Sequence, residues 1–235
     1  VEQLRRELAA DAHDIACFIA EPIQGEGGDR HLSADFLQQV QALCHEHDVL
    51  FVLDEVQTGV GLTGSAWCYQ QLDLEPDLVA FGKKTHVCGV MAGRRIDDVT
   101  DHVFVQSGRL NSTFGGNLVD LTRMAYVFEV IEEEGLIERA GKAGALLLHH
   151  LQDLADRHPA VTNVRGRGLM CAVDLPDAAT RDDVMRRLVA DEHVMLIGSG
   201  SATLRFRPAL TVTDEELEHA VAALDRVLGA IGSRR

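Results

Sequence analysis

Hydrophobic residues in the first part of the chain form short continuous runs separated by polar, glycine-rich segments. A run that is apolar at every position is typical of a strand covered by helices on both faces of a parallel sheet. Such strands are predicted at residues 15–20, 49–53, 78–81 and 90–93. After the first strand, Ser33 can cap a helix whose apolar residues keep helical spacing from Phe36 to Cys44, and another helix is predicted over 65–72. This alternation predicts an α/β fold with a largely parallel sheet.

The second part of the chain has a different pattern, in which long helical stretches precede short strands. Two helices are predicted at 118–133 and 137–158, with Gly135 between them. Short strands at 168–173, 194–197 and 203–206 then lie between helices. Thr213 and Glu216 have the spacing of a capping box, which marks the start of the last helix. Elements mixed in this way are typical of a small α+β domain.

The change of pattern near residue 135 predicts two domains. We expect residues 1–135 to belong to a large α/β domain and residues 136–235 to form a smaller α+β domain. The sequence begins inside a charged helical pattern, from Val1 to Leu8, and has no initiator methionine. We therefore expect the chain to be a fragment of a longer protein.

Composition and charge exclude several classes of function. The formal net charge of −15 spreads along the chain, whereas nucleic-acid binding requires a basic patch. No apolar run approaches the roughly 20 residues that span a bilayer. The five cysteines are scattered without a C-x-x-C pair, so we expect buried thiols in a reducing, cytoplasmic compartment. The neighbouring histidines lack the i, i+4 spacing of a helical metal pair, so no metal is expected.

Reactive side chains follow three of the predicted strands. Ligands bind at the carboxyl ends of strands in open α/β sheets, and the sequence places residues 21–26, residues 54–57 and Lys83 there. Pyridoxal phosphate (PLP) chemistry needs a lysine that bonds to the cofactor and a carboxylate that keeps the pyridine nitrogen protonated. Lys83 and Asp54 suit these roles, although each taken alone is more often an ordinary structural or solvated residue. Residues 59–64 fit G-x-G-x-x-G but start beyond the strand end, which argues against a dinucleotide site.

Four segments, in this order, resemble consecutive motifs of the class III PLP-dependent aminotransferases. They are residues 21–28 (EPIQGEGG), 51–59 (FVLDEVQTG), 76–83 (PDLVAFGK) and 111–117 (NSTFGGN). Residues 165–170 (RGRGLM) resemble the family's entry into its small domain. The resemblance implies the α/β fold of the type I PLP-dependent transferases. Residues 1–135 would then be the C-terminal part of the large PLP-binding domain, and residues 136–235 the small C-terminal domain.

The resemblance also implies a role for individual residues, by their position in these motifs. Lys83 is implied to form the Schiff base with PLP, and Asp54 to pair with the pyridine nitrogen. Val56 would pack on the ring, and Gln57 would hydrogen-bond the ring hydroxyl group. Lys84 stands where the family usually has glycine, so it is the rival of Lys83.

The motif at 111–117 implies contacts across a homodimer. Thr113 would reach the phosphate of the cofactor in the neighbouring subunit, and Ser112 would also bind the cofactor. Asn111 would contact the substrate. The resemblance therefore implies an active site that two subunits share.

Within the family, the chain most resembles members that transfer the ε-amino group of L-lysine to 2-oxoglutarate. The distinguishing residues are 83–89 (KKTHVCG) and Asn117-Leu118. Arg205 matches the arginine that binds the α-carboxylate of 2-oxoglutarate. Glu26 matches an acid that pairs with this arginine when the amino donor is bound, which would spare the protein an unpaired buried guanidinium.

Two alternatives stay open. The donor could be ornithine or 4-aminobutyrate, because much of the donor selectivity in the family lies in a segment that would precede Val1. In relatives that segment also supplies the loop around the PLP phosphate and the aromatic side chain on the ring. The chain by itself could therefore be an inactive α/β fragment that retains only the scaffold.

Overall fold

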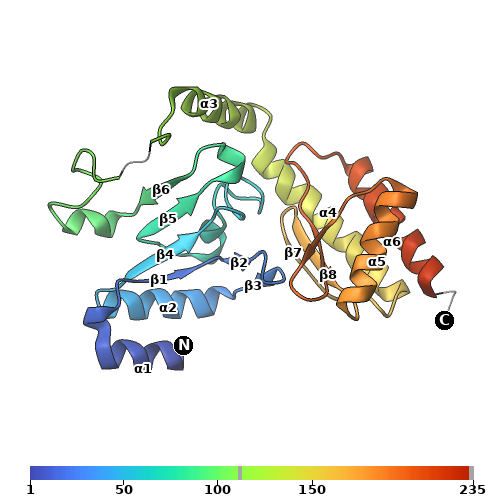
Figure 1. Ribbon diagram of the computed structural model, residues 1–235, viewed down its shortest axis with the longest axis horizontal. Helices are drawn as coiled ribbons and strands as arrows, with labels where there is room; N and C mark the ends of the chain where they lie inside the picture. Colours follow the sequence, from blue (N-terminus) through green and yellow to red (C-terminus); the bar gives the residue numbers. More distant parts are fainter. Residues whose placement is uncertain (111–112, 233–235) are drawn as a thin grey trace. The chain divides into compact units, whose positions relative to one another are not determined.

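The computed structural model describes residues 1–110 and 113–232 (Figure 1). These residues divide into two compact units. The first unit contains residues 1–23, 31–60 and 67–134, and the second contains residues 24–30, 61–66 and the chain from 135 onward. Two short loops from the first half of the sequence therefore belong to the second unit.

A four-stranded sheet with two helices forms most of the first unit. The strands are β1 (Cys17–Ala20), β4 (Leu50–Asp54), β5 (Leu78–Phe81) and β6 (Gly89–Ala92), in the order β1-β4-β5-β6. The first three run parallel and β6 is antiparallel to β5, which confirms the largely parallel sheet. Helices α1 (Glu2–Asp11) and α2 (Ala34–Glu46) lie on one face (Figure 1). Between them and the sheet, Leu37, Val40, Phe51 and Leu53 form a buried core.

The expected burial of β1 on both faces is wrong for this chain. Its burial alternates, with Cys17 exposed and Ile19 60% exposed, while Phe18 packs against the core below α2. The reason is that α1 and α2 cover only one face of β1. The apolar run therefore carries a hydrophobic face that no described residue of the chain covers fully.

The start of α2 was predicted correctly, whereas the helix predicted over residues 65–72 was wrong. Ser33 caps α2 through its hydroxyl, which accepts from the backbone N of Phe36 at 3.2 Å. The helix predicted over 65–72 is only a short 3₁₀ helix, Cys68–Leu72. Trp67 is extended there, and its ring packs against Gly59, where a Cβ would lie 2.4 Å from the ring.

The other elements of the first half are short, apart from one long helix. The short ones are the 3₁₀ helices Ala12–Asp14, Lys83–Thr85 and Arg94–Asp98 and the ribbon β2 (Ile23–Gln24) with β3 (Arg30–His31). Helix α3 (Leu118–Glu133) has the predicted bounds. Among its described residues only Ile131 is buried, so α3 exposes most of its apolar side chains.

The second unit is an antiparallel sheet packed with three helices (Figure 1). Its strands are β7 (Thr162–Arg167), β8 (Met170–Asp174), β9 (Ile197–Ser199) and β10 (Thr203–Phe206), in the order β7-β8-β10-β9. Its helices are α4 (Leu136–Arg157), α5 (Ala178–Glu192) and α6 (Asp214–Gly232). The predicted capping box starts α6: Thr213 N donates to Glu216 Oε2 at 2.8 Å, and Glu216 N donates to Thr213 Oγ1 at 3.1 Å. β7 was not predicted, because its polar sequence lacks an apolar run.

The cysteines only partly follow the expected burial. Cys44, Cys68 and Cys171 are buried, but Cys17 lies on the uncovered face of β1 and Cys88 is exposed before β6. Burial raises the pKa of Cys44 to about 11 and that of Cys171 to about 12, so both stay protonated thiols. Within residues 1–110 and 113–232, none of the helices has the length and apolar character that crossing a membrane requires.

Candidate active site

The carboxyl ends of β4 and β5 bring an acid and a lysine to one edge of the sheet. Asp54 ends β4 and lies beside Ala80 in the parallel register, and Glu55 N donates to Ala80 O at 2.9 Å. The chain after β4 then turns, and Asp54 Oδ1 accepts from Val56 N at 3.0 Å. Lys83 follows two residues after the end of β5. Neighbouring parallel strands therefore deliver Asp54 and Lys83 to adjacent strand ends, as the sheet pattern predicts.

The two consecutive lysines have different surroundings. Lys84 is half-buried, and its Nζ donates to the backbone O of Gln57 at 2.9 Å. Lys83 is exposed, and no described residue forms a hydrogen bond or ion pair with its amine. Lys83 also has a φ of 55°, in the left-handed region that costs a side-chain-bearing residue roughly 1 kcal/mol or more. Its amine is thus available for chemistry, whereas that of Lys84 is engaged within the fold.

Glu55 organises the loop after β4, a role that no motif in the sequence predicted. It is 1% exposed, and its carboxylate accepts from Thr58 Oγ1 and Cys68 N, both at 2.8 Å, and from Tyr69 N at 2.7 Å. Burial raises the pKa of Glu55, while these hydrogen bonds oppose the rise. Glu55 therefore ties the start of the 3₁₀ helix to the end of β4 and fixes the segment that carries Asp54 and Gln57.

We expect Glu55→Ala to destabilise the protein by at least about 2 kcal/mol, because the buried N–H group of Cys68 and the partly buried N–H group of Tyr69 would lose their acceptor. The measurement is the free energy of unfolding in urea. Glu46→Ala, at an exposed acid in the last turn of α2, is the matched control and should cost less than about 0.5 kcal/mol. Equal losses in both variants would contradict the role of Glu55.

The remaining residues expected at the cofactor are only partly described. Gln57 is buried, and Val56 is half-buried in the turn after β4. Thr113 is exposed in the turn before α3. Asn111 and Ser112 lie outside the described residues.

In the second unit, Arg205 is the largest fully buried side chain. It is 2% exposed, and its Nη2 lies 3.0 Å from Glu26 Oε1. Its Nε lies 3.5 Å from Oδ2 of Asp29, which is 1% exposed. The sequence pointed to Arg205 and Glu26 but missed Asp29. The only available signal was an acid at the end of the glycine-rich loop 25–29, which is not specific.

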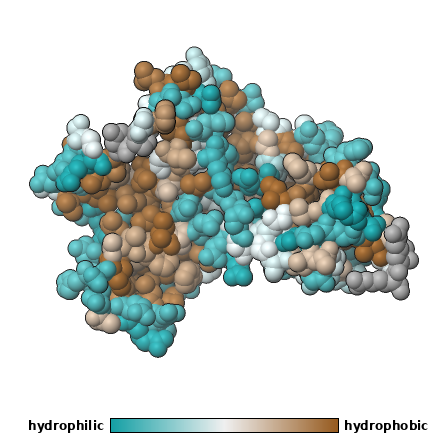
Figure 2. Space-filling view, in the orientation of Figure 1, coloured by the Kyte–Doolittle hydropathy of each residue, from teal (hydrophilic) through white to brown (hydrophobic). Residues whose placement is uncertain are grey.

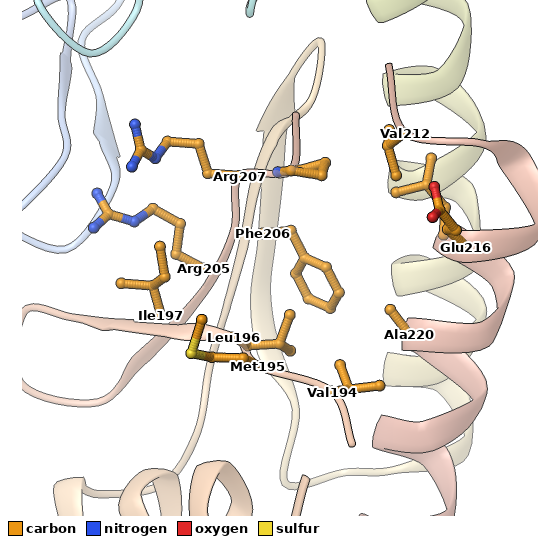
Figure 3. Close-up of a pocket in the computed structure, with 12 residues that line it drawn as sticks. Val194, Met195, Leu196, Ile197, Arg205, Phe206, Arg207, Val212, Glu216 and Ala220 are labelled. Atoms are coloured by element: carbon orange, nitrogen blue, oxygen red, sulfur yellow. The ribbon is translucent and has the colours of Figure 1, made fainter. Parts of the chain in front are cut away.

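Side-chain alternation along the chain places the ring of Phe206 and the guanidinium groups of the two neighbouring arginines on opposite sides. Figure 3 shows the guanidinium groups of Arg205 and Arg207 pointing to the same side, away from the ring of Phe206. Phe206 faces a cavity of about 160 Å³ whose apolar lining includes Leu196 and Val212. The chemistry of the second unit is therefore concentrated on the arginine side of the strand.

The fold and these residues define the class of protein. Residues 1–228 match the family Aminotransferase class-III, and the chain belongs to this family. It is 56% identical over 98% of its length to an L-lysine-epsilon aminotransferase of Streptomyces clavuligerus, and 58% identical over 93% to one of Amycolatopsis lactamdurans. A solved lysine aminotransferase from Mycobacterium tuberculosis matches 98% of the chain with a TM-score of 0.95 and 54% identity. These findings confirm the predicted family and α/β fold.

The chain spans only part of these proteins. It covers 51% and 49% of the two relatives and 53% of the solved chain, which is about half of each. The family is PLP-dependent, and the residues present fit that cofactor. Asp54 offers a carboxylate and Lys83 an unengaged amine at adjacent strand ends, while the competing amine of Lys84 is held by Gln57.

Proposed function

We propose that the protein containing this chain transfers the ε-amino group of L-lysine to 2-oxoglutarate, giving 2-aminoadipate 6-semialdehyde and glutamate. The observation that carries this choice of substrates is the pairing of a buried arginine with a solvent-exposed acid. Arg205 is 2% exposed, whereas the side chain of its partner Glu26 is 75% exposed. Such an acid can leave without unfolding its surroundings, so one arginine can serve two different substrates in turn.

Two residues of the first unit would perform the chemistry that both half-reactions share. PLP, when bound, supplies a ring that accepts the electron pair left on the substrate carbon after deprotonation. The carboxylate of Asp54 would hold a proton on the pyridine nitrogen. The Nζ of Lys83 would carry the cofactor and then move a proton from the carbon that bears the amino group. Gln57 and Val56 would orient the ring through its hydroxyl group and its face.

Arg205 and Glu26 would distinguish the substrates by charge. The α-carboxylate of 2-oxoglutarate can take the place of the Glu26 carboxylate and bind the guanidinium in bidentate fashion. The ε-amino end of L-lysine brings no carboxylate to that position, so Glu26 would stay paired with Arg205. A buried guanidinium that lost its acid without receiving another would be costly. The same pair thereby accepts both a dicarboxylate and an amine.

We expect the two half-reactions to respond differently to the two substitutions. In single-turnover measurements on the full-length protein, Arg205→Ala should slow the 2-oxoglutarate half about a hundredfold and the lysine half only slightly. Glu26→Ala should slow the lysine half about tenfold and spare the 2-oxoglutarate half. The double variant should be less impaired with lysine than additivity predicts, because the charge that Glu26 masks is gone.

Arg207→Ala is the matched control, since this arginine lies two residues further on the same side of the chain (Figure 3). It should change both half-reactions less than about threefold. Equal damage to both halves from Glu26→Ala would mean that Glu26 is an ordinary structural acid. A strong preference for ornithine or 4-aminobutyrate over lysine would overturn the proposed donor.

The first unit has an exposed apolar surface, and this surface is evidence for the proposal that the protein forms a homodimer. Figure 2 shows hydrophobic atoms over α3 and the segment before it. The most exposed of these side chains are Phe114 at 84%, Leu118 at 80%, Val119 at 67% and Tyr126 at 64%. A patch of this kind marks an interaction surface in a folded protein. We propose that it is buried in a homodimer in which Thr113, Ser112 and Asn111 act on the partner's site.

The exposed apolar face of β1 is a surface against which another part of the full-length protein can pack. Ile19 and Cys17 lie exposed on a strand whose apolar run predicts cover on both faces. We propose that a part of the full-length protein corresponding to the other half of its relatives packs there. The free cysteines support the proposed reducing, cytoplasmic location.

A further inference from the structure

Asp29 is a buried acid to which the proposed reaction gives no role. It lies in the loop between β2 and β3, and its Oδ2 is 3.5 Å from the Nε of Arg205. Its φ of 47° is left-handed, a conformation that Asp and Asn adopt more readily than other side chains. Asp29 therefore approaches Arg205 from the side of Nε, while Glu26 contacts the outer nitrogen Nη2.

The backbone around Asp29 is held in place by a second arginine. Arg165 donates from Nε to the backbone O of Asp29 at 2.8 Å and from Nη2 to that of Gly28 at 2.6 Å. Arg165 is itself paired with Asp174, at 2.8 Å. These bonds fix the main chain of the loop, and the side chain of Asp29 is 1% exposed, so its carboxylate is held beside Arg205.

Glu26 differs from Asp29 in the exposure of its side chain. Its backbone O accepts from Gly200 N at 3.1 Å, which anchors the main chain, but its side chain is 75% exposed. Arg205 thus has one fixed acid and one that can move. We propose that Asp29 is a positioning residue, the permanent counter-ion that orients the guanidinium of Arg205 while Glu26 and a substrate carboxylate exchange on its outer nitrogens. This inference rests on the proposed function, in which Arg205 binds 2-oxoglutarate.

Orientation, rather than net charge, is the effect that Asp29 would exert on the exchange. Its negative charge acts on the carboxylate of Glu26 and on the substrate carboxylate that replaces it, so its field largely cancels between the two states. A guanidinium without the fixed acid, in contrast, would have to be ordered by the incoming substrate at a cost in binding. Loss of the acid should therefore weaken 2-oxoglutarate and leave the lysine half nearly unchanged.

The ionisation of Asp29 makes this role dependent on pH. Burial raises the pKa of Asp29 to about 6, opposed by Arg205, the Ser199 hydroxyl and Arg165 and assisted by Glu26. The hydroxyl of Ser199 can lower the pKa only when it turns to Asp29, since in the structure it donates to Gly25 O at 2.5 Å. The charged and titratable groups that face Asp29 are Arg205, Arg165, Glu26 and Cys171. Asp29 is therefore ionised at pH 8 and mostly protonated near pH 5.5.

The test is Asp29→Asn in the full-length protein, since Asn keeps the shape and tolerates the left-handed backbone. At pH 8 the KM for 2-oxoglutarate should rise about tenfold, with the rate of the lysine half within twofold of wild type. The ratio of the variant KM to the wild-type KM should fall from about ten at pH 8 to about three at pH 5.5, where most of the wild-type Asp29 is protonated. The matched control is Asp73→Asn, at an exposed aspartate with a φ of 52°. It should change neither the KM for 2-oxoglutarate nor the rate of the lysine half.

Three outcomes separate the inference from the function on which it rests. A ratio of variant to wild-type KM that is independent of pH would show a structural defect and overturn the inference that ionised Asp29 orients Arg205. If Arg205→Ala raises the KM but Asp29→Asn does not, the inference alone fails. If Arg205→Ala also leaves the KM unchanged, the proposed function fails.

A measurement on the unmodified protein covers the case in which Asp29→Asn does not fold. Glutarate is a dicarboxylate that lacks the reacting carbonyl, and its affinity can be followed by calorimetry. Its Kd for the wild-type protein should fall about threefold between pH 5.5 and pH 8, because about a quarter of Asp29 is already ionised at the lower pH. A constant Kd over this range would overturn the inference without any variant.

Discussion

Lys83→Ala should abolish turnover in the full-length protein, because it removes the amine at this sheet edge that no described residue engages. Lys83 is exposed beyond the end of β5, and no described residue pairs with its side chain. The same variant should lose the visible absorbance band of the lysine-bonded cofactor. Borohydride should fix PLP to a single lysine in the wild-type protein and to none in the variant.

Lys84→Ala is the matched control for this prediction. The amine of Lys84 donates to Gln57 O at 2.9 Å, so its loss should cost some stability while turnover and the absorbance band persist. If the two variants behaved in the reverse way, Lys84 would be the cofactor-bearing residue. If the isolated chain showed no band with added PLP while the full-length protein did, residues outside this chain would be needed for binding.

Asp54→Asn should slow deprotonation of the substrate by at least about a hundredfold, which corresponds to roughly 3 kcal/mol of transition-state stabilisation. An amide cannot hold the pyridine nitrogen protonated as a carboxylate does, so the ring would accept the electron pair less readily. The cofactor itself should stay bound. The measurement is a stopped-flow record of single turnovers with L-lysine, compared with the wild-type protein.

Reconstitution with a modified cofactor provides a second test of the role of Asp54. PLP methylated on its pyridine nitrogen carries a fixed positive charge that needs no acid to maintain it. Reconstitution of Asp54→Asn with this analogue should recover part of the lost rate. Near-normal turnover of Asp54→Asn with ordinary PLP would remove Asp54 from the reaction.

The sequence by itself determined the features that depend on short spacing. The cap of α2 by Ser33 and the capping box of Thr213 and Glu216 join groups three residues apart, so the pattern alone predicts them. The meeting of Asp54 and Lys83 at one sheet edge is nearly as direct. It requires only that the strands preceding them be parallel neighbours, because the carboxyl ends of such strands meet at one edge.

Only the tertiary structure decided which groups are buried and which charges meet. Asp29 lies 3.5 Å from Arg205, and Glu55 receives the N–H groups of Cys68 and Tyr69, although these partners are far apart in sequence. Trp67 is extended and packs on Gly59 where a helix was predicted, and one face of β1 is exposed although its apolar run predicted burial on both faces. Such contacts form when distant loops are brought together by the whole fold, and no local spacing of residues records them.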